Sequence, residues 1–318
     1  MTKILILGGS GFVGSHVCEK LTRAQCRVTV ATRRRENARH LQLLPLVDVV
    51  EVNPHDSPSM ASLLAGHDAV VNLIAILHGS EAAFEKAHVQ LPLELARACE
   101  ASGLRRLVHV SALGASLSSA SMYQRSKARG EALLLSAGLD ATVLRPSVMF
   151  GAEDKFLNTF ARLQQFFPVI PLAGSQARFQ PVWVEDVASA IVHCLQDTST
   201  IGQVYEACGP EVFTLRQLVE LAGRYAGVHG GEGRAVLALP EALARVQARL
   251  MELAPGEPLL SRDNLDAMKT DNVASGKVPG LEALGITPAS LRAIGPSYLG
   301  AQGLRSGLTA KRKTAGRF

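Results

Sequence analysis

A tyrosine and a lysine four residues apart, Tyr123 and Lys127, are the side chains best suited to acid–base chemistry. They lie at the start of a helical stretch, so this spacing places them on one face of the helix. An ammonium group beside a phenol lowers the phenol pKa, which lets a tyrosine exchange a proton with a substrate carbonyl or alcohol. The same spacing is common on the surface of any helix. The pair therefore indicates catalysis only where a cofactor site accompanies it.

A glycine-rich run near the start of the chain predicts such a site. Its sequence is Gly8-Gly9-Ser10-Gly11-Phe12-Val13-Gly14. Gly8, Gly11 and Gly14 allow a tight turn, close approach of the backbone to a pyrophosphate, and close packing of a helix on a strand. The run lies between an expected strand and an expected helix, whose first N–H groups would face the phosphates. This order of elements predicts a dinucleotide-binding site.

The residues after the second expected strand distinguish between the two nicotinamide dinucleotides. An NAD-specific site places a carboxylate there, which accepts a hydrogen bond from the ribose 2′-hydroxyl. This chain instead has three consecutive arginines, Arg33, Arg34 and Arg35. Guanidinium groups bind an anionic 2′-phosphate bidentately, so we expect NADP(H) in preference to NAD(H). Arg33 is the expected phosphate ligand, and the other two arginines are interpreted as solvated.

Short apolar runs that alternate with helical patterns must position these residues. The expected strands are Lys3–Leu7, Arg27–Ala31, Val47–Val52, Ala69–Leu73, Arg106–Val110 and Ala141–Leu144. Strands of nearly continuous apolar character are typical of a parallel sheet that is buried on both faces. Strand–helix alternation predicts right-handed βαβ units. The expected fold class is α/β, a Rossmann doubly wound parallel sheet with a smaller helix-rich C-terminal lobe.

The expected division of the chain follows a change of pattern after Pro146. Residues 1–146 are expected to form the dinucleotide-binding Rossmann domain, and residues 181–200 to add a helix that packs back on it. Residues 147–180 and 201–318 are expected to form the C-terminal lobe, which ends in a basic tail at 304–318. Within that lobe the pattern predicts a strand at Gln203–Ala207 and helices at Leu215–Ala226 and Pro240–Leu253.

Composition and charge narrow the class of protein. No apolar run approaches the roughly 20 residues of a membrane-spanning helix, and no signal-peptide pattern is found, so we expect a cytoplasmic protein. Five scattered cysteines without CxxC spacing argue against a disulfide framework and against a metal site. Outside the tail, basic and acidic residues are equal in number, at 28 each, which argues against a nucleic-acid partner. The basic tail is interpreted as a solvated terminus, or as a contact with an anionic membrane surface or an acidic partner.

These motifs together resemble the short-chain dehydrogenase/reductase family, in its extended or atypical form. The matching pieces, which cover about the first two-thirds of the chain, are the glycine run, Asp56, Asn72-Leu73-Ile74-Ala75, Ser111, Tyr123 with Lys127, Arg145-Pro146 and Phe179-Gln180-Pro181-Val182. Residues 111–134, 144–163, 178–188 and 263–299 are similar to a narrower family, the NADPH-binding accessory subunits of respiratory complex I and their bacterial relatives. With these segments the resemblance extends over nearly the whole chain.

The resemblance implies roles for individual residues. The pyrophosphate would be lined by Gly8, Ser10, Gly11, Phe12, Val13 and Gly14. The remaining cofactor-binding positions would be Arg33 at the 2′-phosphate, Asp56 near the adenine, Ala75 and Lys127 at the nicotinamide ribose, and Pro146. Tyr123 would be the proton donor, and Ser111 its nearest hydroxyl partner.

The chain departs from the family pattern at one catalytic position. Sugar-nucleotide epimerases of the extended family have a catalytic hydroxyl a couple of residues beyond the serine that ends the fifth strand. Here that stretch is Ser111-Ala112-Leu113, so the hydroxyl is missing, and only a short interval separates it from Tyr123. A nucleotide-sugar epimerase or dehydratase is therefore disfavoured.

Two functions stay open. The first is an NADP(H)-binding accessory or assembly protein of respiratory NADH:quinone oxidoreductase, in which the nucleotide is largely structural and the protein is peripheral at the inner face of the membrane. The second is an active NADPH-dependent reductase for a small or hydrophobic carbonyl compound of a quinone pathway, with Tyr123 as general acid. The sequence leaves open the substrate, the oligomeric state and whether the Tyr–Lys pair is used.

Overall fold

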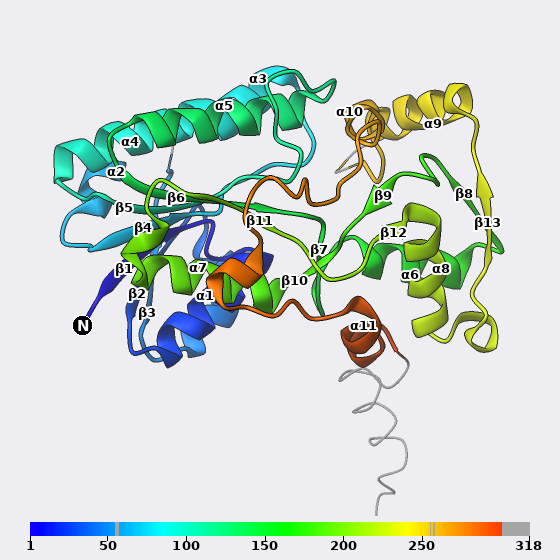
Figure 1. The fold of residues 1–318 in the computed structure, drawn as a ribbon, viewed down its shortest axis with the longest axis horizontal. Coiled ribbons are helices and arrows are strands. Elements are labelled where there is room, and N and C mark those ends of the chain that lie inside the picture. The colour runs from blue at the N-terminus through cyan, green and yellow to red at the C-terminus, as the bar shows by residue number, and fades with distance from the viewer. Residues whose placement is uncertain (55–56, 255, 257, 301–318) are drawn as a thin grey trace, which may run out of the picture. The chain divides into compact units, whose positions relative to one another are not determined.

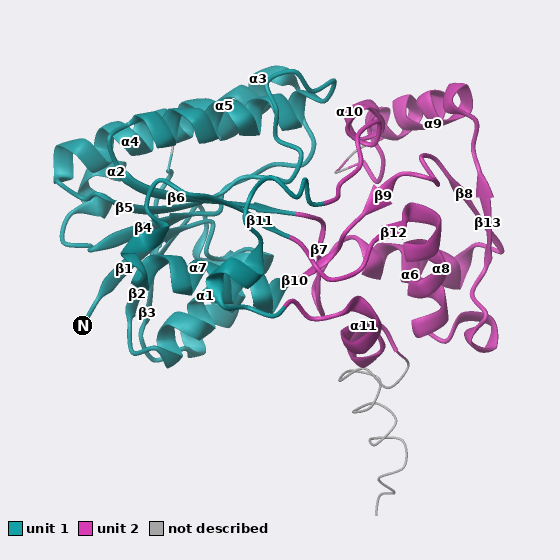
Figure 2. Ribbon diagram, in the orientation of Figure 1, with its two compact units in different colours: residues 1–146, 184–207, 274–287 teal, residues 147–183, 208–273, 288–318 magenta. Residues whose placement is uncertain are grey.

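The chain folds into two units (Figure 2) in a computed structural model that describes residues 1–54, 57–254, 256 and 258–300. Unit 1 consists of residues 1–146, 184–207 and 274–287. Unit 2 consists of the described residues within 147–183, 208–273 and 288–300. The basic tail at 304–318 lies outside the described residues.

Two segments expected in the C-terminal lobe belong to unit 1 instead. Residues 201–207 do so because β11 (Val204–Ala207) pairs with β6 (Asp140–Pro146) in the main sheet. Residues 274–287 also belong to unit 1, because the Glu206 N–H on β11 donates to the Pro279 carbonyl at 2.9 Å. Both additions result from pairing between segments far apart in the sequence.

Unit 1 is built on one sheet of seven parallel strands (Figure 1), in the order β11-β6-β5-β4-β1-β2-β3. The other strands are β1 (Lys3–Leu7), β2 (Arg27–Thr32), β3 (Val47–Glu51), β4 (Ala69–Asn72) and β5 (Arg106–Val110). The predicted α/β Rossmann fold is confirmed, and every expected strand pairs in this sheet. The expected burial on both faces is wrong for the edge strand β3, where Val49 alone is buried.

Helices cover both faces of the sheet (Figure 1). On one face lie α1 (Phe12–Arg23) and α7 (Val184–Gln196), and on the other α2 (Ser57–Leu64), α4 (Leu91–Ser102) and α5 (Met122–Ser136). The shorter elements are α3 (Glu81–Glu85), the π-helical turn η2 (Lys86–Gln90), and the 3₁₀ turns η1 (Arg35–Leu43), η3 (Thr198–Thr200) and η5 (Leu281–Leu284). Glu185 ties α7 to α1, because its carboxylate lies 2.6 Å from His16 Nδ1 and 2.7 Å from Lys20 Nζ.

The strand order reverses at β1. Strands β2 and β3 lie on one side of it, and β4, β5, β6 and β11 on the other. In sheets of this kind ligands bind outside the carboxyl ends of the strands at such a switch point. Gly8 follows β1 and Leu73 follows β4, and a Cβ on Gly8 would lie only 3.1 Å from the Leu73 carbonyl carbon. The two loops that border the switch point are therefore in contact.

Unit 2 is rich in helices. These are α6 (Leu157–Phe166), α8 (Leu215–Tyr225), α9 (Glu241–Leu253), α10 (Arg262–Ala267), α11 (Leu291–Leu299) and the 3₁₀ turn η4 (Val228–Gly231). Three strand pairs accompany them: β7 (Met149–Phe150) with β10 (Val182–Trp183), β8 (Val169–Leu172) with β13 (Ala235–Ala238), and β9 (Arg178–Phe179) with β12 (Phe213–Thr214). Within the part of the chain that the structure describes, every helix is too short or too polar to cross a bilayer.

A buried carboxylate organises the first helix of unit 2. Asp154 Oδ1 accepts hydrogen bonds from the N–H groups of Phe156, Leu157 and Asn158, at 2.9, 2.6 and 3.2 Å. These are N–H groups that the start of α6 would otherwise leave without a partner. Its other oxygen accepts from the Tyr298 hydroxyl on α11 at 3.0 Å. One side chain therefore both caps α6 and connects it to the C-terminal helix.

Candidate functional site

The loop between β1 and α1 has no room for a side chain at some of its glycines. Gly8 has a φ of +81°, which residues with a Cβ rarely adopt. A Cβ on Gly14 would lie 2.5 Å from both the Cα and the carbonyl oxygen of Gly9. The Gly11 N–H donates to the Gly8 carbonyl at 3.1 Å, which closes a tight turn. The first turn of α1 thus rests directly on the loop.

The N-terminus of α1 is open to an anion. Gly11 is its N-cap, and a glycine has no side chain to accept hydrogen bonds from the first N–H groups of the helix. By contrast, α5, α8 and α10 are capped by the side-chain oxygens of Ser121, Thr214 and Ser261. Unpartnered N–H groups at the positive end of a helix bind phosphate groups. Ser10, Phe12 and Val13 are only partly buried at this end of the helix, as a phosphate site requires.

The three consecutive arginines differ in their surroundings. Arg33 is exposed, and its guanidinium makes no ion pair or hydrogen bond with the described residues. Arg34 is exposed too. The interpretation of Arg35 as a solvated side chain is wrong. Its Nη2 donates to the Val49 carbonyl at 3.1 Å, and its backbone N–H donates to Glu51 Oε2 at 3.1 Å. Asp56, the residue expected near the adenine, lies outside the described residues.

A buried asparagine shapes the loop after β4. Asn72 Oδ1 accepts from the Ile74 N–H at 3.1 Å, and its Nδ2 lies 3.2 Å from His109 Nδ1 on β5. Because an amide nitrogen only donates, His109 Nδ1 is the acceptor and carries no proton. Burial, and then the Lys127 charge, hold the pKa of His109 well below its usual value. The neutral pair fixes the turn that exposes Ala75 beyond it.

Ser111, Tyr123 and Lys127 lie at the carboxyl end of β5 and the start of α5. Lys127 is 2% exposed, and its Nζ donates to the Val110 carbonyl at 2.7 Å, next to Ser111 in the chain. Ser111 Oγ is buried and has no hydrogen-bond partner among the described residues. A buried hydroxyl without a partner is uncommon and needs an explanation. A bound ligand or a water molecule would supply the missing hydrogen bond.

Burial controls the ionisation of the Tyr–Lys pair. It raises the pKa of Tyr123 to about 12 and lowers that of Lys127 to about 8, although Glu131 opposes the second change. The lowering of the phenol pKa expected from the neighbouring ammonium is therefore not found. The physical reason is that the loss of hydration on burial disfavours the charged phenolate.

The position where epimerases of the family have a hydroxyl is occupied by a buried leucine. Leu113 is 3% exposed, and its N–H donates to the carbonyl of Pro146, the last residue of β6, at 2.9 Å. The hydrogen bond places Pro146 at the same end of the sheet as Ser111. Nothing at position 113 can polarise a substrate.

Two side chains of this region were missed by sequence reasoning, His88 and Ser126. His88 Nδ1 lies 2.8 Å from Ser126 Oγ, which in turn donates to the Tyr123 carbonyl at 2.8 Å. His88 comes from a different helical segment, so its distance from Tyr123 along the sequence carries no signal. The residue pattern also contains no sign that the turn carrying His88 is π-helical.

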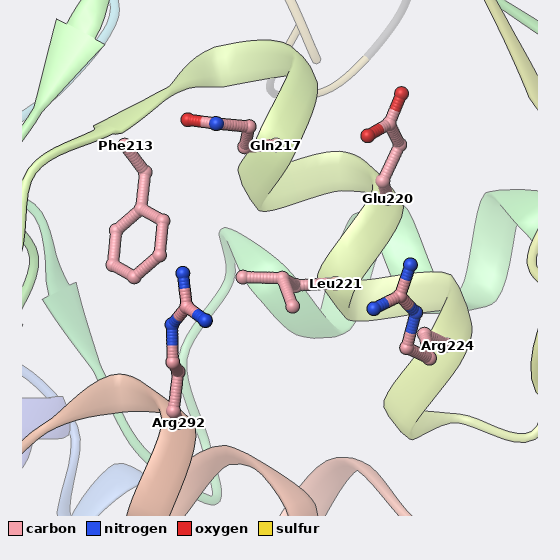
Figure 3. Close-up of a pocket in the computed structure, with 6 residues that line it drawn as sticks. All are labelled: Phe213, Gln217, Glu220, Leu221, Arg224 and Arg292. Carbon is pink, nitrogen blue, oxygen red and sulfur yellow. The ribbon is translucent and has the colours of Figure 1, made fainter.

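A small hollow in unit 2 contains none of the predicted residues (Figure 3). It is lined by Phe213, Gln217, Glu220, Leu221, Arg224 and Arg292. The Arg292 guanidinium lies 5.5 Å above the Phe213 ring centroid, and its Nε is 2.9 Å from Glu211 Oε1, so this cation is already paired. The described residues contain no group of three or more His, Cys, Asp or Glu side chains able to hold a metal ion. The candidate site is therefore the one in unit 1.

The fold and this site agree with the family to which the chain belongs. Residues 4–208 match the NAD dependent epimerase/dehydratase family, and the chain is a member of that family. The chain is 32% identical over 310 residues to NADH dehydrogenase (ubiquinone) 1 alpha subcomplex subunit 9, mitochondrial, of Arabidopsis thaliana, covering 92% of this chain and 76% of that protein. The protein of the same name from Mus musculus is 32% identical over 295 residues, covering 90% and 76%. The resemblance predicted from the motifs is confirmed.

Solved structures share the fold at low sequence identity. An NADPH-dependent quinone oxidoreductase of Escherichia coli complexed with NADPH has a TM-score of 0.74 at 20% identity, covering 92% of this chain and 98% of that one. A dTDP-glucose 4,6-dehydratase of Streptomyces venezuelae with NAD bound has a TM-score of 0.72 at 21% identity, covering 94% and 96%. The same fold thus accompanies both nicotinamide dinucleotides.

Proposed function

We propose that this protein binds a nicotinamide dinucleotide in unit 1, NADP(H) in preference to NAD(H), and acts as an accessory or assembly protein of a respiratory NADH:quinone oxidoreductase. The observation that carries the proposal is the extent of the similarity to subunits named for that enzyme. It spans 90% or more of this chain, and so includes unit 2 as well as the dinucleotide fold. The protein would be peripheral at the inner face of the membrane.

The residues of unit 1 fit a dinucleotide. The backbone of the glycine loop packs on α1 too closely for a Cβ at Gly14, α1 begins without a side-chain cap, and Ser111 Oγ has no hydrogen-bond partner among the described residues. Gly8, Ser10, Gly11, Phe12, Val13 and Gly14 would hold the pyrophosphate, and Arg33, Asp56, Ala75, Lys127 and Pro146 the two nucleoside ends. Asp56 is assigned from the family resemblance alone.

A structural role for the nucleotide is supported by the residue at position 113. Leu113 is buried where epimerases of the family have a hydroxyl, so it cannot assist Tyr123 in catalysis. A ligand that binds only the folded state stabilises it by about 2.7 kcal/mol when present at 100 times its Kd. Holding the dinucleotide would therefore stabilise unit 1 without any turnover.

Unit 2 has a surface suited to a larger assembly. Leu243, Val246, Leu250 and Leu253 on α9 form a row of large apolar side chains, each at least 57% exposed. Their spacing places them on one side of the helix, while Ala244 and Ala248 are buried on another. Contiguous exposed apolar surface is typical of proteins that function in contact with partners. This row supports the accessory function over that of an isolated enzyme.

The first experiment is to denature the purified protein and identify any released nucleotide by mass, with its amount per chain. About one NADP(H) per chain, retained through purification, is the result expected of a structural cofactor. Protein that arrives empty and binds added NADPH reversibly would instead favour a turning-over enzyme. Release of NAD(H) would contradict the assignment of Arg33.

Arg33→Ala is expected to weaken NADPH binding by about 10- to 100-fold and to leave NADH binding unchanged. The reason is that a charge-assisted contact to the 2′-phosphate is worth roughly 1.5–3 kcal/mol, and NADH lacks that phosphate. Titration calorimetry with both dinucleotides measures the difference. Arg34→Ala, at an exposed neighbouring arginine, is the matched control and should change neither affinity. Equal losses for NADPH and NADH in Arg33→Ala would refute the assignment.

A second function is supported by the grouping of Ser111, Tyr123 and Lys127 at one end of the sheet. Here the protein would be a reductase for a small or hydrophobic carbonyl compound. Bound NADPH would supply the hydride. With a pKa of about 12, the Tyr123 phenol carries its proton at neutral pH and can donate it to the substrate oxygen, while Lys127 holds the ribose and orients the phenol.

Tyr123→Phe separates the two functions. If the pair is catalytic, turnover in a screen of quinones and hydrophobic carbonyl compounds should fall about 100-fold or more, with NADPH affinity unchanged. If the nucleotide is structural, the variant should retain the bound nucleotide, the thermal stability and the association with the respiratory enzyme shown by wild type. Loss of NADPH affinity in this variant would contradict both assignments of the phenol.

A further inference from the structure

The turn that carries His88 has an unusual form. Residues Lys86–Gln90 form the π-helical turn η2 between α3 and α4. Such turns are rare and occur frequently at functional sites. A Cβ on Gly130 of α5 would lie 1.9 Å from the His88 carbonyl oxygen, so the turn packs directly against the backbone of α5. Its position is therefore tightly determined by the helix that carries Tyr123 and Lys127.

The His88 side chain is 2% exposed and makes a hydrogen bond at each ring nitrogen. Nε2 lies 3.1 Å from the Ile76 N–H in the loop after β4, and Nδ1 lies 2.8 Å from Ser126 Oγ on α5. A backbone N–H only donates, so Nε2 accepts and the proton of the neutral ring is on Nδ1. Burial, and then the Lys127 charge, lower the pKa of His88 to about 3, which agrees with a neutral ring.

The same ring also contacts the candidate acid. His88 and Tyr123 meet edge to face with centroids 5.4 Å apart, and His88 stacks on Phe84 at 5.6 Å. Ser126 Oγ, the acceptor of the Nδ1 proton, donates its own to the Tyr123 carbonyl at 2.8 Å. His88 thus constrains both the ring and the backbone of Tyr123, while its other nitrogen holds the Ile76 amide next to Ala75.

From these contacts we infer that His88 is a positioning residue that connects the loop after β4, at residues 73–76, to Tyr123. The Ile76 hydrogen bond sets the loop that borders the dinucleotide crevice, and the Ser126 hydrogen bond and the ring contact set the phenol. The part of this inference that concerns the nucleotide rests on the proposed function. The part that concerns the loop does not.

Three substitutions separate the two hydrogen bonds. His88→Gln can place its amide oxygen near the position of Nε2 and keep the Ile76 hydrogen bond. His88→Asn is shorter, so it can reach Ser126 and not Ile76. His88→Phe keeps the ring contacts and loses both hydrogen bonds. If His88 only fills space, His88→Phe should be the variant that behaves most like wild type. If His88 holds the loop as inferred, His88→Gln should be the variant whose loop behaves most like that of wild type.

The loop is tested in nucleotide-free protein by hydrogen exchange at the Ile76 amide. We expect exchange at least tenfold faster than wild type in His88→Asn and His88→Phe, and close to wild type in His88→Gln. NADPH affinity and the fluorescence of the bound reduced nicotinamide are then measured in the same proteins. Affinity should fall about tenfold in His88→Asn and His88→Phe and be rescued in His88→Gln.

The outcomes distinguish the two proposals. If wild type binds no dinucleotide, the proposed function fails, and the Ile76 exchange rates still decide the role of His88. If Ile76 exchanges at the wild-type rate in all three variants, or equally fast in all three, the inference is overturned. If the exchange rates follow the expected order while NADPH affinity is the same in every variant, His88 sets the loop but does not act on the site, which also overturns it.

Discussion

Gly14→Ala is expected to weaken dinucleotide binding strongly and to destabilise unit 1. An added Cβ would meet the Cα and carbonyl oxygen of Gly9 at 2.5 Å and the Gly8 carbonyl oxygen at 2.6 Å. All three are backbone atoms, so no side chain can rotate away, and either α1 or the loop must move. Overpacking of this kind typically costs about 1–3 kcal/mol. Movement of the loop by several tenths of an ångström should raise the Kd for NADPH by about 100-fold or more.

The measurement is urea unfolding together with NADPH titration, for wild type and three variants. Gly11→Ala is the informative comparison, because its Cβ would meet only the Gly8 carbonyl oxygen, at 3.3 Å, and its φ of −87° suits any residue. It should weaken NADPH binding, since its Cβ would approach the phosphates, but leave nucleotide-free stability near that of wild type. Glu19→Ala, on an exposed position of α1, should change neither quantity. A Gly14→Ala protein as stable and as tightly bound as Glu19→Ala would contradict the close packing of α1 on the loop.

The parts of the fold that the sequence predicted are those set by neighbouring residues. Ile4–Leu7 are all buried, and an apolar run followed at once by a glycine loop and an amphipathic helix has few other structures available. The glycine positions were predictable for the same reason, because tight turns and close packing place requirements on single residues. The fold class, the parallel sheet and the phosphate loop could therefore be predicted from the local residue pattern together with the family resemblance.

What the sequence left open depends on contacts between distant segments. The assignment of residues 274–287 to unit 1 rests on a hydrogen bond from Glu206, and a neutral His109 on one from Asn72. The pKa of Tyr123 depends on burial, which a residue pattern on one helix does not show. The role of His88 was not predictable for a similar reason. A rare π-helical turn brings its side chain to residues more than ten positions away in the sequence.

Lys127→Met is expected to stabilise the nucleotide-free protein and to remove its response to NADPH. Burial lowers the pKa of Lys127 from 10.5 to about 8, and one pKa unit corresponds to about 1.4 kcal/mol. The charged form therefore costs the folded state about 3 kcal/mol at pH 7. Methionine fills a similar volume without a charge, but it leaves the Val110 carbonyl without its donor, which costs about 1 kcal/mol. The net gain expected at pH 7 is about 1–2 kcal/mol.

The pH dependence identifies the lysine as the cause. Below pH 8 the ammonium is charged in both the folded and the unfolded chain, so the full cost is present. Between pH 8 and 10.5 the unfolded chain still binds this proton while the folded chain has released it, so wild-type stability gains with rising pH from this group. The advantage of Lys127→Met should therefore shrink over that interval. The cysteines and tyrosines titrate in the same pH range in both proteins. Their contribution cancels in the difference between the free energies of unfolding of the two proteins.

Addition of NADPH should reverse the order of stability. Wild type at 100 times its Kd gains about 2.7 kcal/mol, whereas the variant gains little, since it lacks the ribose ligand. Arg129→Met is the matched control, because it lies on the same helix with its side chain 51% exposed and should keep the NADPH response. An advantage that is constant from pH 7 to 10.5, or a variant that binds NADPH as wild type does, would contradict the argument. A cation retained at a cost of about 3 kcal/mol to the empty fold is explained if unit 1 is normally folded around its nucleotide.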